Sequence, residues 1–387
     1  MRARSMHNRT RHLAPLALTA ALLLTFWAPV AAQDLRNGSA GGGVHFQGYS
    51  FDDGLGVQSA NLLLFPLAYE FSAGDRTRLD LYGAWARGQV EADGRRLSLD
   101  GPVDTRIRAR FRALPWALVT VGVNLPTGNE SHTDEEALVS SALATELLGF
   151  REAAWGMGSA VTTGVATAWS VGEWGVGLGG SYRVSGEFNP EAGSDLVYGP
   201  GNQLRLRAAL DRNVGEASRL TLGATVQNFA EDEVDGRNLF QAGNRFRVDL
   251  GLNFRLGATT WTAYGANLWR DRGDLTLDLV DQDGAVVGDT VLTTGYQNVA
   301  AAGVNGNVPV TGTFRVRPMA ELRVQNRELG QGSGWLVAAG GDLPLRLMGA
   351  YEVFPRAMIR VGAMESAEGE DRSVWGGDLG LTLRWRR

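Results

Sequence analysis

The chain has 387 residues, with 37 arginines, 42 acidic residues and neither cysteine nor lysine, so its formal net charge is −5. The absence of cysteine excludes disulfide bonds, thiolate metal sites and cysteine nucleophiles. An acidic chain lacks the basic surface that nucleic-acid binding requires, so we expect no nucleic-acid partner. Glycine is abundant, with 52 residues. Helical periodicity is nearly absent, which favours an all-β protein.

Residues 1–32 have the three-part pattern of a secretory signal peptide. Four arginines precede an apolar run over residues 14–30, and small residues suited to signal peptidase follow. We expect cleavage after Ala32 and export of residues 33–387 as a single domain. Without the four leader arginines, this domain has 33 of the 37 basic residues against 42 acids, a net charge of −9. The alternative is a retained membrane anchor, for which the apolar run is short.

Beyond residue 33, apolar and polar residues alternate over segments of roughly ten residues bounded by turn residues. A strand directs successive side chains to opposite faces, so this alternation predicts strands with one apolar and one polar face. The expected strands lie near residues 42–51, 57–71, 77–91, 96–113, 116–126, 157–171, 174–188, 202–213, 218–230, 244–257, 259–270, 294–306, 312–326, 334–345, 351–363 and 373–386.

Most connections from the third strand onward alternate between short and long. The long ones cover about 127–156, 189–201, 231–243, 271–293, 327–333 and 364–372. Outer-membrane barrels have short periplasmic turns and longer external loops. The sequence therefore predicts an all-β fold, a transmembrane antiparallel up-and-down β-barrel of about 14–16 strands. Its expected location is the cell outer membrane, where lipid, lipopolysaccharide and the barrel-assembly machinery would be its partners.

One short helix is expected in the longest of these loops. Thr133 and Glu136 form a capping box. Gly149 is a plausible stop for this helix. The apolar residues at roughly helical spacing are Leu138, Ala142, Leu143, Leu147 and Phe150. Two positions are open for this helix: it lies across the rim of the barrel, or its loop folds inward and narrows the lumen.

Residues 103–112 show the polar face most clearly. One face carries Val103, Thr105, Ile107, Ala109 and Phe111, and the other carries Asp104 with four arginines. Four unpaired guanidinium groups cannot face a dry core, so we expect them to face a wet lumen. The candidate lumen-lining residues for solute contact are Arg106, Arg108, Arg110, Arg112, Arg205, Arg207, Arg245, Arg247, Arg315 and Arg317. Arg255, Arg323 and Arg384 share this phase, as do the acids Asp80, Asp104, Asp211, Asp249, Glu321 and Asp378.

Two interpretations of the arginines remain open, and they can coexist. In the first interpretation, the arginines form a lattice of ion pairs with lumen acids and brace the wall. Alternatively, surplus positive charge attracts solutes with carboxylate or phosphate groups, which the planar guanidinium binds through two parallel hydrogen bonds.

Signals for enzymatic chemistry are weak. His45 and His132 are the histidines beyond the leader, and the sequence has neither an HExxH motif nor a Gly-x-Ser-x-Gly elbow. We expect no catalytic residue, no cofactor and no metal site. Acidic clusters near residues 231–235, 271–283 and 365–371 lack the spacing of an EF-hand and are interpreted as solvated loops. A barrel hydrolase that uses one of the histidines is a less favoured hypothesis.

Three short motifs carry a resemblance to a known group of proteins. They are Leu-Ser-Leu-Asp-Gly-Pro-Val-Asp-Thr at residues 97–105, Gly-Val-Asn-Leu-Pro-Thr-Gly at 122–128, and Ser-Tyr-Arg-Val with Gly-Glu-Phe-Asn-Pro within 181–190. The chain resembles Gram-negative outer-membrane proteins linked to the phenol-degradation meta-pathway and the wider long-chain fatty acid transporter superfamily. The specific part of the resemblance covers residues 97–190. It implies passage of small hydrophobic or amphipathic molecules across the outer membrane.

Together these observations predict an outer-membrane channel or transporter for small hydrophobic or amphipathic solutes. The arginine-rich lumen favours anionic ones. The alternative is a structural or adhesive outer-membrane barrel whose lumen is closed by ion pairs.

Overall fold

The computed structural model describes residues 38–386 except 281–285, 312–313, 329–331 and 348–349. The expected signal peptide lies outside the described residues. In the part of the chain that is described, no helix is long and apolar enough to cross a membrane.

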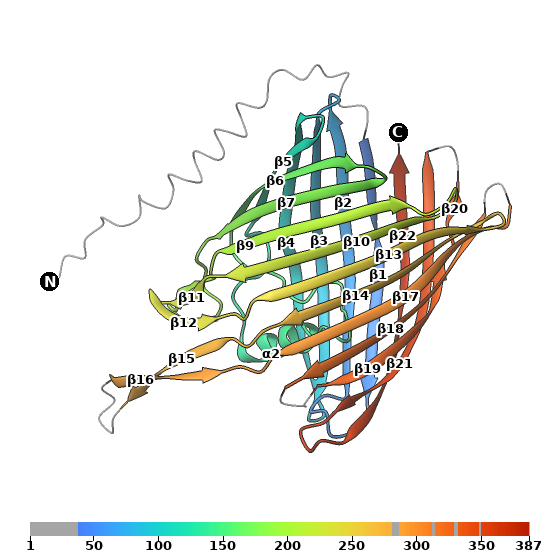
Figure 1. The fold of residues 1–387 in the computed structure, drawn as a ribbon. Helices are drawn as coiled ribbons and strands as arrows, with labels where there is room; N and C mark the ends of the chain where they lie inside the picture. Colours follow the sequence, from blue (N-terminus) through green and yellow to red (C-terminus); the bar gives the residue numbers. More distant parts are fainter. Residues whose placement is uncertain (1–37, 281–285, 312–313, 329–331, 348–349, 387) are drawn as a thin grey trace.

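The chain forms a closed antiparallel barrel of 16 strands (Figure 1). The first strand pairs with the last, from Ser39 opposite Arg386 to Phe51 opposite Val374, which closes the barrel. The barrel strands are β1 (Gly38–Phe51), β2 (Ser59–Ala73), β3 (Thr77–Ala92), β4 (Arg95–Leu114), β5 (Ala117–Leu125), β6 (Ala160–Val171), β7 (Trp174–Ser185), β9 (Gln203–Asn213), β10 (Arg219–Phe229), β13 (Arg245–Leu256), β14 (Thr259–Arg270), β17 (Gln297–Pro309), β18 (Arg315–Arg327), β19 (Gly334–Asp342), β20 (Leu345–Arg346), β21 (Tyr351–Glu365) and β22 (Asp371–Arg386).

The short segment β20 continues β19 as one barrel strand. Asp342 pairs with Arg356 and Leu345 with Val353, so both segments keep the same register against β21. Pro344 lies in the gap, where a residue without an N–H group interrupts the ladder. The predicted number of strands and the predicted fold class are therefore confirmed.

The two ends of the barrel differ as expected. The described first and last residues lie at the end with the short turns, and the long connections lie at the opposite end (Figure 1). Residues 172–173 join β6 to β7, whereas 34 residues, 126–159, join β5 to β6. We call these the short-turn end and the long-loop end.

Three of the expected loops contain strands that the sequence analysis missed. A separate five-stranded sheet extends beyond the barrel wall at the long-loop end (Figure 1). Its strands are β8 (Tyr198–Gly199), β11 (Glu231–Val234), β12 (Arg237–Gln241), β15 (Asp274–Val280) and β16 (Val286–Thr293). Acidic β11 resembles a loop in composition, but Asp235 and Gly236 both have positive φ and form the turn of a hairpin.

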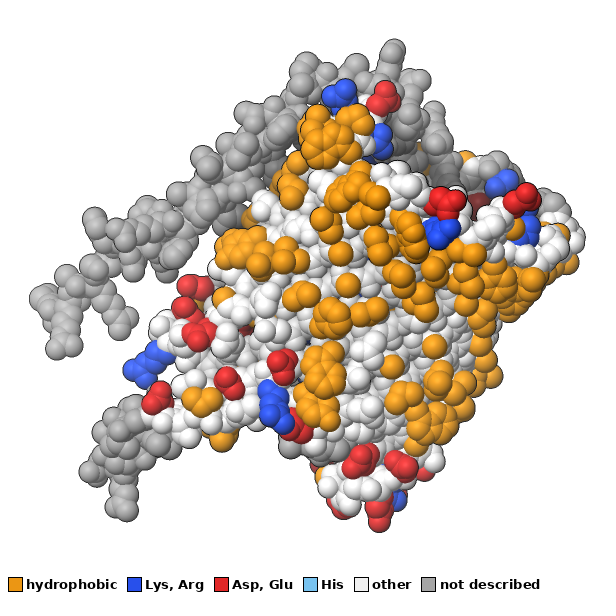
Figure 2. All heavy atoms as spheres, in the orientation of Figure 1, with side chains coloured by type: hydrophobic (Ala, Val, Ile, Leu, Met, Phe, Trp, Pro, Cys, Tyr) orange, Lys and Arg blue, Asp and Glu red, His pale blue; other side chains and the backbone are white. Residues whose placement is uncertain are grey.

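The outer face of the barrel is apolar. Val165, Ile359 and Leu379 expose 60%, 70% and 61% of their surface. Figure 2 shows apolar side chains over the flank, with most of the charged ones toward the two ends. Aromatic residues lie near the strand ends, with Trp116, Trp169 and Tyr351 toward the short turns and Trp269, Trp335 and Trp375 toward the long loops. An exposed apolar band between aromatic residues is typical of barrels embedded in lipid.

Residues 126–159 fold into the barrel, and we call this segment the plug. Its helix α2 (Asp134–Leu143) contacts β2, β3 and β4. Thr133 and Glu136 form the expected capping box. Val139, Leu143 and Trp155 are buried in one cluster with inward side chains of these strands, including Leu62, Leu64, Val90 and Leu99. The inward position is thus the one observed, and the alternative position across the rim is wrong.

The helix is shorter than the apolar spacing suggested. It ends at Leu143, and Gly149 lies six residues further on in a turn with φ +60°. Leu147 and Phe150 continue the spacing because they pack into a second cluster around Tyr49. A Cβ at residue 149 would collide with the Arg323 guanidinium, so glycine permits the close approach of the plug to β18.

A bulge in β4 overturns one part of the expected face assignment. Tyr82 pairs with Arg106 but Ala84 pairs with Val103, so β4 has an extra residue here. Val103 was assigned to the outer face, yet it is 2% exposed and lies in the core beneath the plug. Asp104 is also buried. A bulge brings two neighbouring side chains to one face, which strict alternation does not anticipate.

Candidate solute pathway

Asp104 fastens both ends of the plug to the barrel wall. This aspartate is 3% exposed. One carboxylate oxygen accepts the Gly128 amide N–H at 3.0 Å, and the other accepts the Met157 amide N–H at 2.9 Å. The Asn124 side chain donates to the second oxygen at 2.8 Å. The plug therefore begins and ends at this one carboxylate, which lies next to the bulge of β4.

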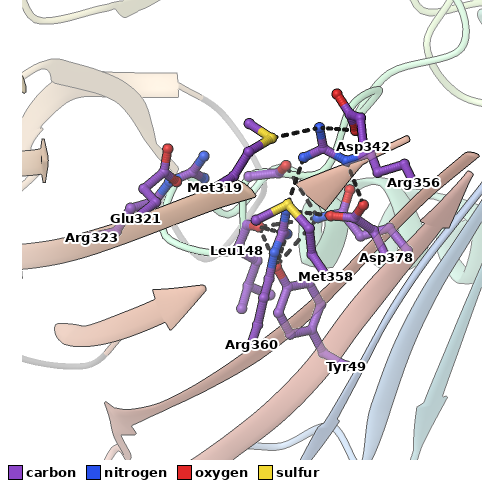
Figure 3. Close-up of polar contacts among 12 residues, drawn as sticks. Tyr49, Leu148, Met319, Glu321, Arg323, Asp342, Arg356, Met358, Arg360 and Asp378 are labelled. Atoms are coloured by element: carbon purple, nitrogen blue, oxygen red, sulfur yellow. Dashed lines mark hydrogen bonds and ion pairs between the residues drawn. The ribbon is translucent and has the colours of Figure 1, made fainter. Parts of the chain in front are cut away.

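A second anchor joins the plug to β1, β21 and β22 (Figure 3). The Leu148 carbonyl of the plug accepts hydrogen bonds from the Tyr49 hydroxyl at 2.5 Å and from Arg360 Nη1 at 3.3 Å. Gln47 Nε2 donates to the same carbonyl at 3.2 Å. Arg360 is held in turn by Asp378 at 2.8 Å. The plug is therefore fixed to β1, β21 and β22 as well as to β4.

Three of the four β4 arginines form ion pairs. Arg106 lies 3.2 Å from Glu152 of the plug. Arg108 and Arg110 lie 2.9 and 2.7 Å from the two oxygens of Asp80 on β3. These pairs match the interpretation in which arginines brace the wall.

The other predicted arginines divide into a few that form an ion pair and a larger set without one. Arg247 pairs with Asp249 at 2.7 Å, and Arg323 pairs with Glu321 at the same distance. Among the described residues, no acid forms an ion pair with Arg112, Arg205, Arg207, Arg245, Arg315, Arg317, Arg255 or Arg384.

Four of the predicted arginines converge on β10. Arg205 and Arg245 both pair in register with Gln227, and Arg207 and Arg247 both pair with Thr225. The two flanking strands, β9 and β13, are about 10 Å apart across β10. This arginine cluster, which we define as Arg205, Arg207, Arg245 and Arg247, contains three cations that lack an ion pair within the described chain.

The wall around the arginine cluster has small side chains. A cavity of about 800 Å³ opens there between β6 and β13, and it extends toward the short-turn end. Its lumen-facing lining includes Ala168, Gly175, Gly177, Gly223 and Arg207. In strand order this wall lies far around the ring from β2–β4, where α2 packs. Small residues leave space that the large apolar side chains of β2–β4 do not.

The structure adds inward arginines that the candidate set did not include, among them five on β7, β14, β21 and the plug. Arg183 precedes the β7–β9 connection, and Arg270 pairs in register with Arg245. Arg356 and Arg360 lie on the polar phase of β21, so alternation alone would have identified them. Arg151 lies in the plug, where no strand phase indicates its direction.

The two histidines lie apart from each other in different surroundings. His45 Nε2 lies 3.2 Å from the Thr382 hydroxyl. His132 is in the plug, where burial lowers the pKa of its imidazole. Burial also raises the pKa of the nearby plug residue Glu130, and the Asp104 carboxylate raises it further. Among the described residues, neither histidine side chain forms a hydrogen bond with a serine or an aspartate.

No protein-family model and no curated protein matches the chain. Solved structures of outer-membrane barrels align with nearly all of it. A deletion mutant of the TodX monoaromatic hydrocarbon channel aligns with a TM-score of 0.47 at 12% identity, covering 94% of this chain and 92% of that one. An outer membrane channel from Pseudomonas putida F1 aligns with a TM-score of 0.37 at 14% identity, covering 90% of this chain and 95% of that one. OmpT of Vibrio cholerae with loop L8 deleted aligns with a TM-score of 0.41 at 11% identity, covering 90% of this chain and 99% of that one.

These similarities have a limited meaning. All three identities are below 15% and all three TM-scores are below 0.5.

Proposed function

We propose that the protein is an outer-membrane channel for small amphipathic anions. The solute would pass along the wall formed by β6 to β13, beside the plug. The predicted signal peptide, the closed barrel, the apolar flank and the different lengths of turns and loops support the outer-membrane location.

The arginine cluster around β10 is the observation that carries this proposal. Three of its guanidinium groups have no ion pair within the described chain, and their strands are neighbours of β10. Arg207 lines the lumen cavity, together with small residues and the acids Asp211 and Asp249. An unpaired cation in a narrow passage remains charged because water enters the passage, and its field raises the local concentration of anions. Arginine binds carboxylates through two parallel hydrogen bonds, which suits it to such solutes.

The resemblance to the phenol-degradation and fatty acid transporter group remains a prediction, because no family model matches the chain. It is compatible with an amphipathic solute. The plug and its contacts with the barrel wall support the alternative of a closed structural barrel. The cavity along β6–β13 favours the channel.

Planar-bilayer recording tests the proposal. Purified protein that migrates faster on unboiled than on boiled gels is folded and is added to a bilayer in a salt gradient. We expect stepwise conductance and a reversal potential on the anion-selective side. Folded protein without conductance steps would establish the closed barrel. Conductance that favours cations would contradict the role of the arginine cluster.

A further inference from the structure

A smaller cavity lies beneath the plug, toward the short-turn end. Its volume is about 240 Å³, room for about eight water molecules. It is lined by residues of β1, β18, β19, β21 and β22, and Arg151 of the plug covers it from the long-loop side. Segments far apart in the sequence therefore build one compartment inside the barrel.

The cavity has a surplus of positive charge. Among the described residues, Arg151, Arg317 and Arg384 have no ion pair. The fourth arginine of the lining, Arg356, lies 2.7 Å from Asp378 and 3.5 Å from Asp342 (Figure 3).

Two further groups complete the local charge balance. Asp378 also holds Arg360, so one carboxylate serves two arginines. Glu352 faces Arg384 in the strand register but pairs with Arg346. The acids nearby are therefore engaged with other cations, and three guanidinium groups are available to an anion.

Two of the available guanidinium groups lie over the same aromatic ring. The Arg317 and Arg384 guanidinium carbons each lie 5.7 Å from the centre of the Phe354 ring. The ring supports both guanidinium groups through cation–π interactions and presents apolar surface at the same place. The lining also contains His45, whose Nε2 lies 3.2 Å from the Thr382 hydroxyl. The lining thus combines cations, an apolar wall and a polar edge.

We propose that this cavity, the aryl-acid site, binds a small carboxylic acid with a flat apolar body. The carboxylate would lie between Arg317, Arg384 and Arg151, and the apolar body would lie against Phe354. The limited volume excludes long acyl chains, and the aromatic wall favours a carboxylate with an apolar body over inorganic phosphate. The site deepens the proposed channel function and rests on it for its biological role, since the channel would bring the solute into the lumen that the site faces.

Calorimetric titration of the folded protein in detergent tests the site with sodium benzoate. We expect one benzoate to bind per chain, with benzamide at least roughly tenfold weaker because it lacks the charge. The double variant R317Q/R384Q should weaken benzoate binding roughly tenfold or more. The matched control is Arg212→Gln, since Arg212 pairs with Glu173 and stacks on Trp174 at the opposite side of the barrel. This control should bind benzoate like the wild-type protein.

A second variant keeps the test decisive if R317Q/R384Q does not fold. Phe354→Ala retains every cation but removes the ring, and it should weaken benzoate more than it weakens acetate. Absence of benzoate binding to folded wild-type protein would overturn the site, as would equal binding of benzamide or of inorganic phosphate. Binding is measured without ion flow, so a protein that conducts without binding benzoate would overturn the site and leave the channel proposal intact. Benzoate binding without conductance would support the site and overturn the channel proposal.

Discussion

At the scale of single residues, Asp104 has the largest expected effect on the plug. Alanine at this position would leave three donors, on Gly128, Met157 and Asn124, without their acceptor. Each unsatisfied buried donor costs about 1–3 kcal/mol. We predict that Asp104→Ala releases the plug, so trypsin cleaves after Arg151 roughly tenfold faster than in the wild-type protein.

The cleavage site is well suited to this measurement. Arg151 lies inside the barrel, where trypsin cannot reach it until the plug leaves. Asp249→Ala is the control, because Asp249 pairs with Arg247 on β13 and forms no hydrogen bond with the plug among the described residues. Equal cleavage rates in both variants and in the wild-type protein would show that Asp104 does not hold the plug.

Substitution of paired arginines is expected to lower the stability of the protein more than substitution of unpaired ones. R108Q/R110Q leaves the Asp80 carboxylate without its two partners, so we predict a loss of about 1–2 kcal/mol in urea unfolding. Adding Asp80→Asn should restore part of this loss. R205Q/R207Q removes no ion pair, so its stability should change by no more than about 0.5 kcal/mol. Equal losses in the two double variants would contradict the assigned pairing.

Sequence alternation can assign strand arginines to the lumen phase, because period-two patterning follows directly from strand geometry. It could not predict which of them are paired. Asp80 lies 28 residues before Arg108, and Glu152 belongs to the plug, so both pairs depend on the three-dimensional register. The bulge at Val103 could not be predicted either, because apolar and polar residues still alternate in the sequence there.

At the scale of elements, Trp155 packs the plug into the core of the barrel. This side chain is completely buried, and its indole N–H donates to the Ala86 carbonyl at 3.0 Å. Truncating a buried tryptophan costs about 3–5 kcal/mol. We predict that Trp155→Ala loosens the plug and raises single-channel conductance. The neighbouring Met157→Ala is the control, because the Met157 side chain is 47% exposed. Conductance that does not differ between the two variants would mean that the plug does not limit flow.

The existence of the plug helix was predictable and its position was not. The capping box marks the start of α2 because both of its hydrogen bonds are local. Whether the helix lies on the rim or within the lumen depends on Leu62, Val90 and Leu99, which present an apolar surface inside a barrel that alternation makes polar elsewhere. In β2 this inner patch is visible as a run of leucines on both faces.

At the scale of the whole molecule, the barrel has two different walls. The plug covers β2–β4 and reaches β1, β18, β21 and β22, whereas the arginine cluster and small residues line β6–β13. This division explains how one lumen can contain a packed plug and a passage for solutes. The strand count and the order of short and long connections were predictable, because hydrophobic periodicity and turn residues are local. The hairpins β11–β12 and β15–β16 were not, since their acidic sequences resemble loops.

The central claim is that unpaired positive charge on the β6–β13 wall selects anions, and the reversal potential of R205Q/R207Q/R245Q tests it most directly. Each protein is recorded in a potassium chloride gradient, with Arg212→Gln as the control. We predict that the triple variant shifts toward cations relative to wild type and control. The shift should shrink as salt rises, because the screening length falls from about 10 Å at 0.1 M to about 3 Å at 1 M. A folded, conducting triple variant with the reversal potential of the wild-type protein would contradict the account.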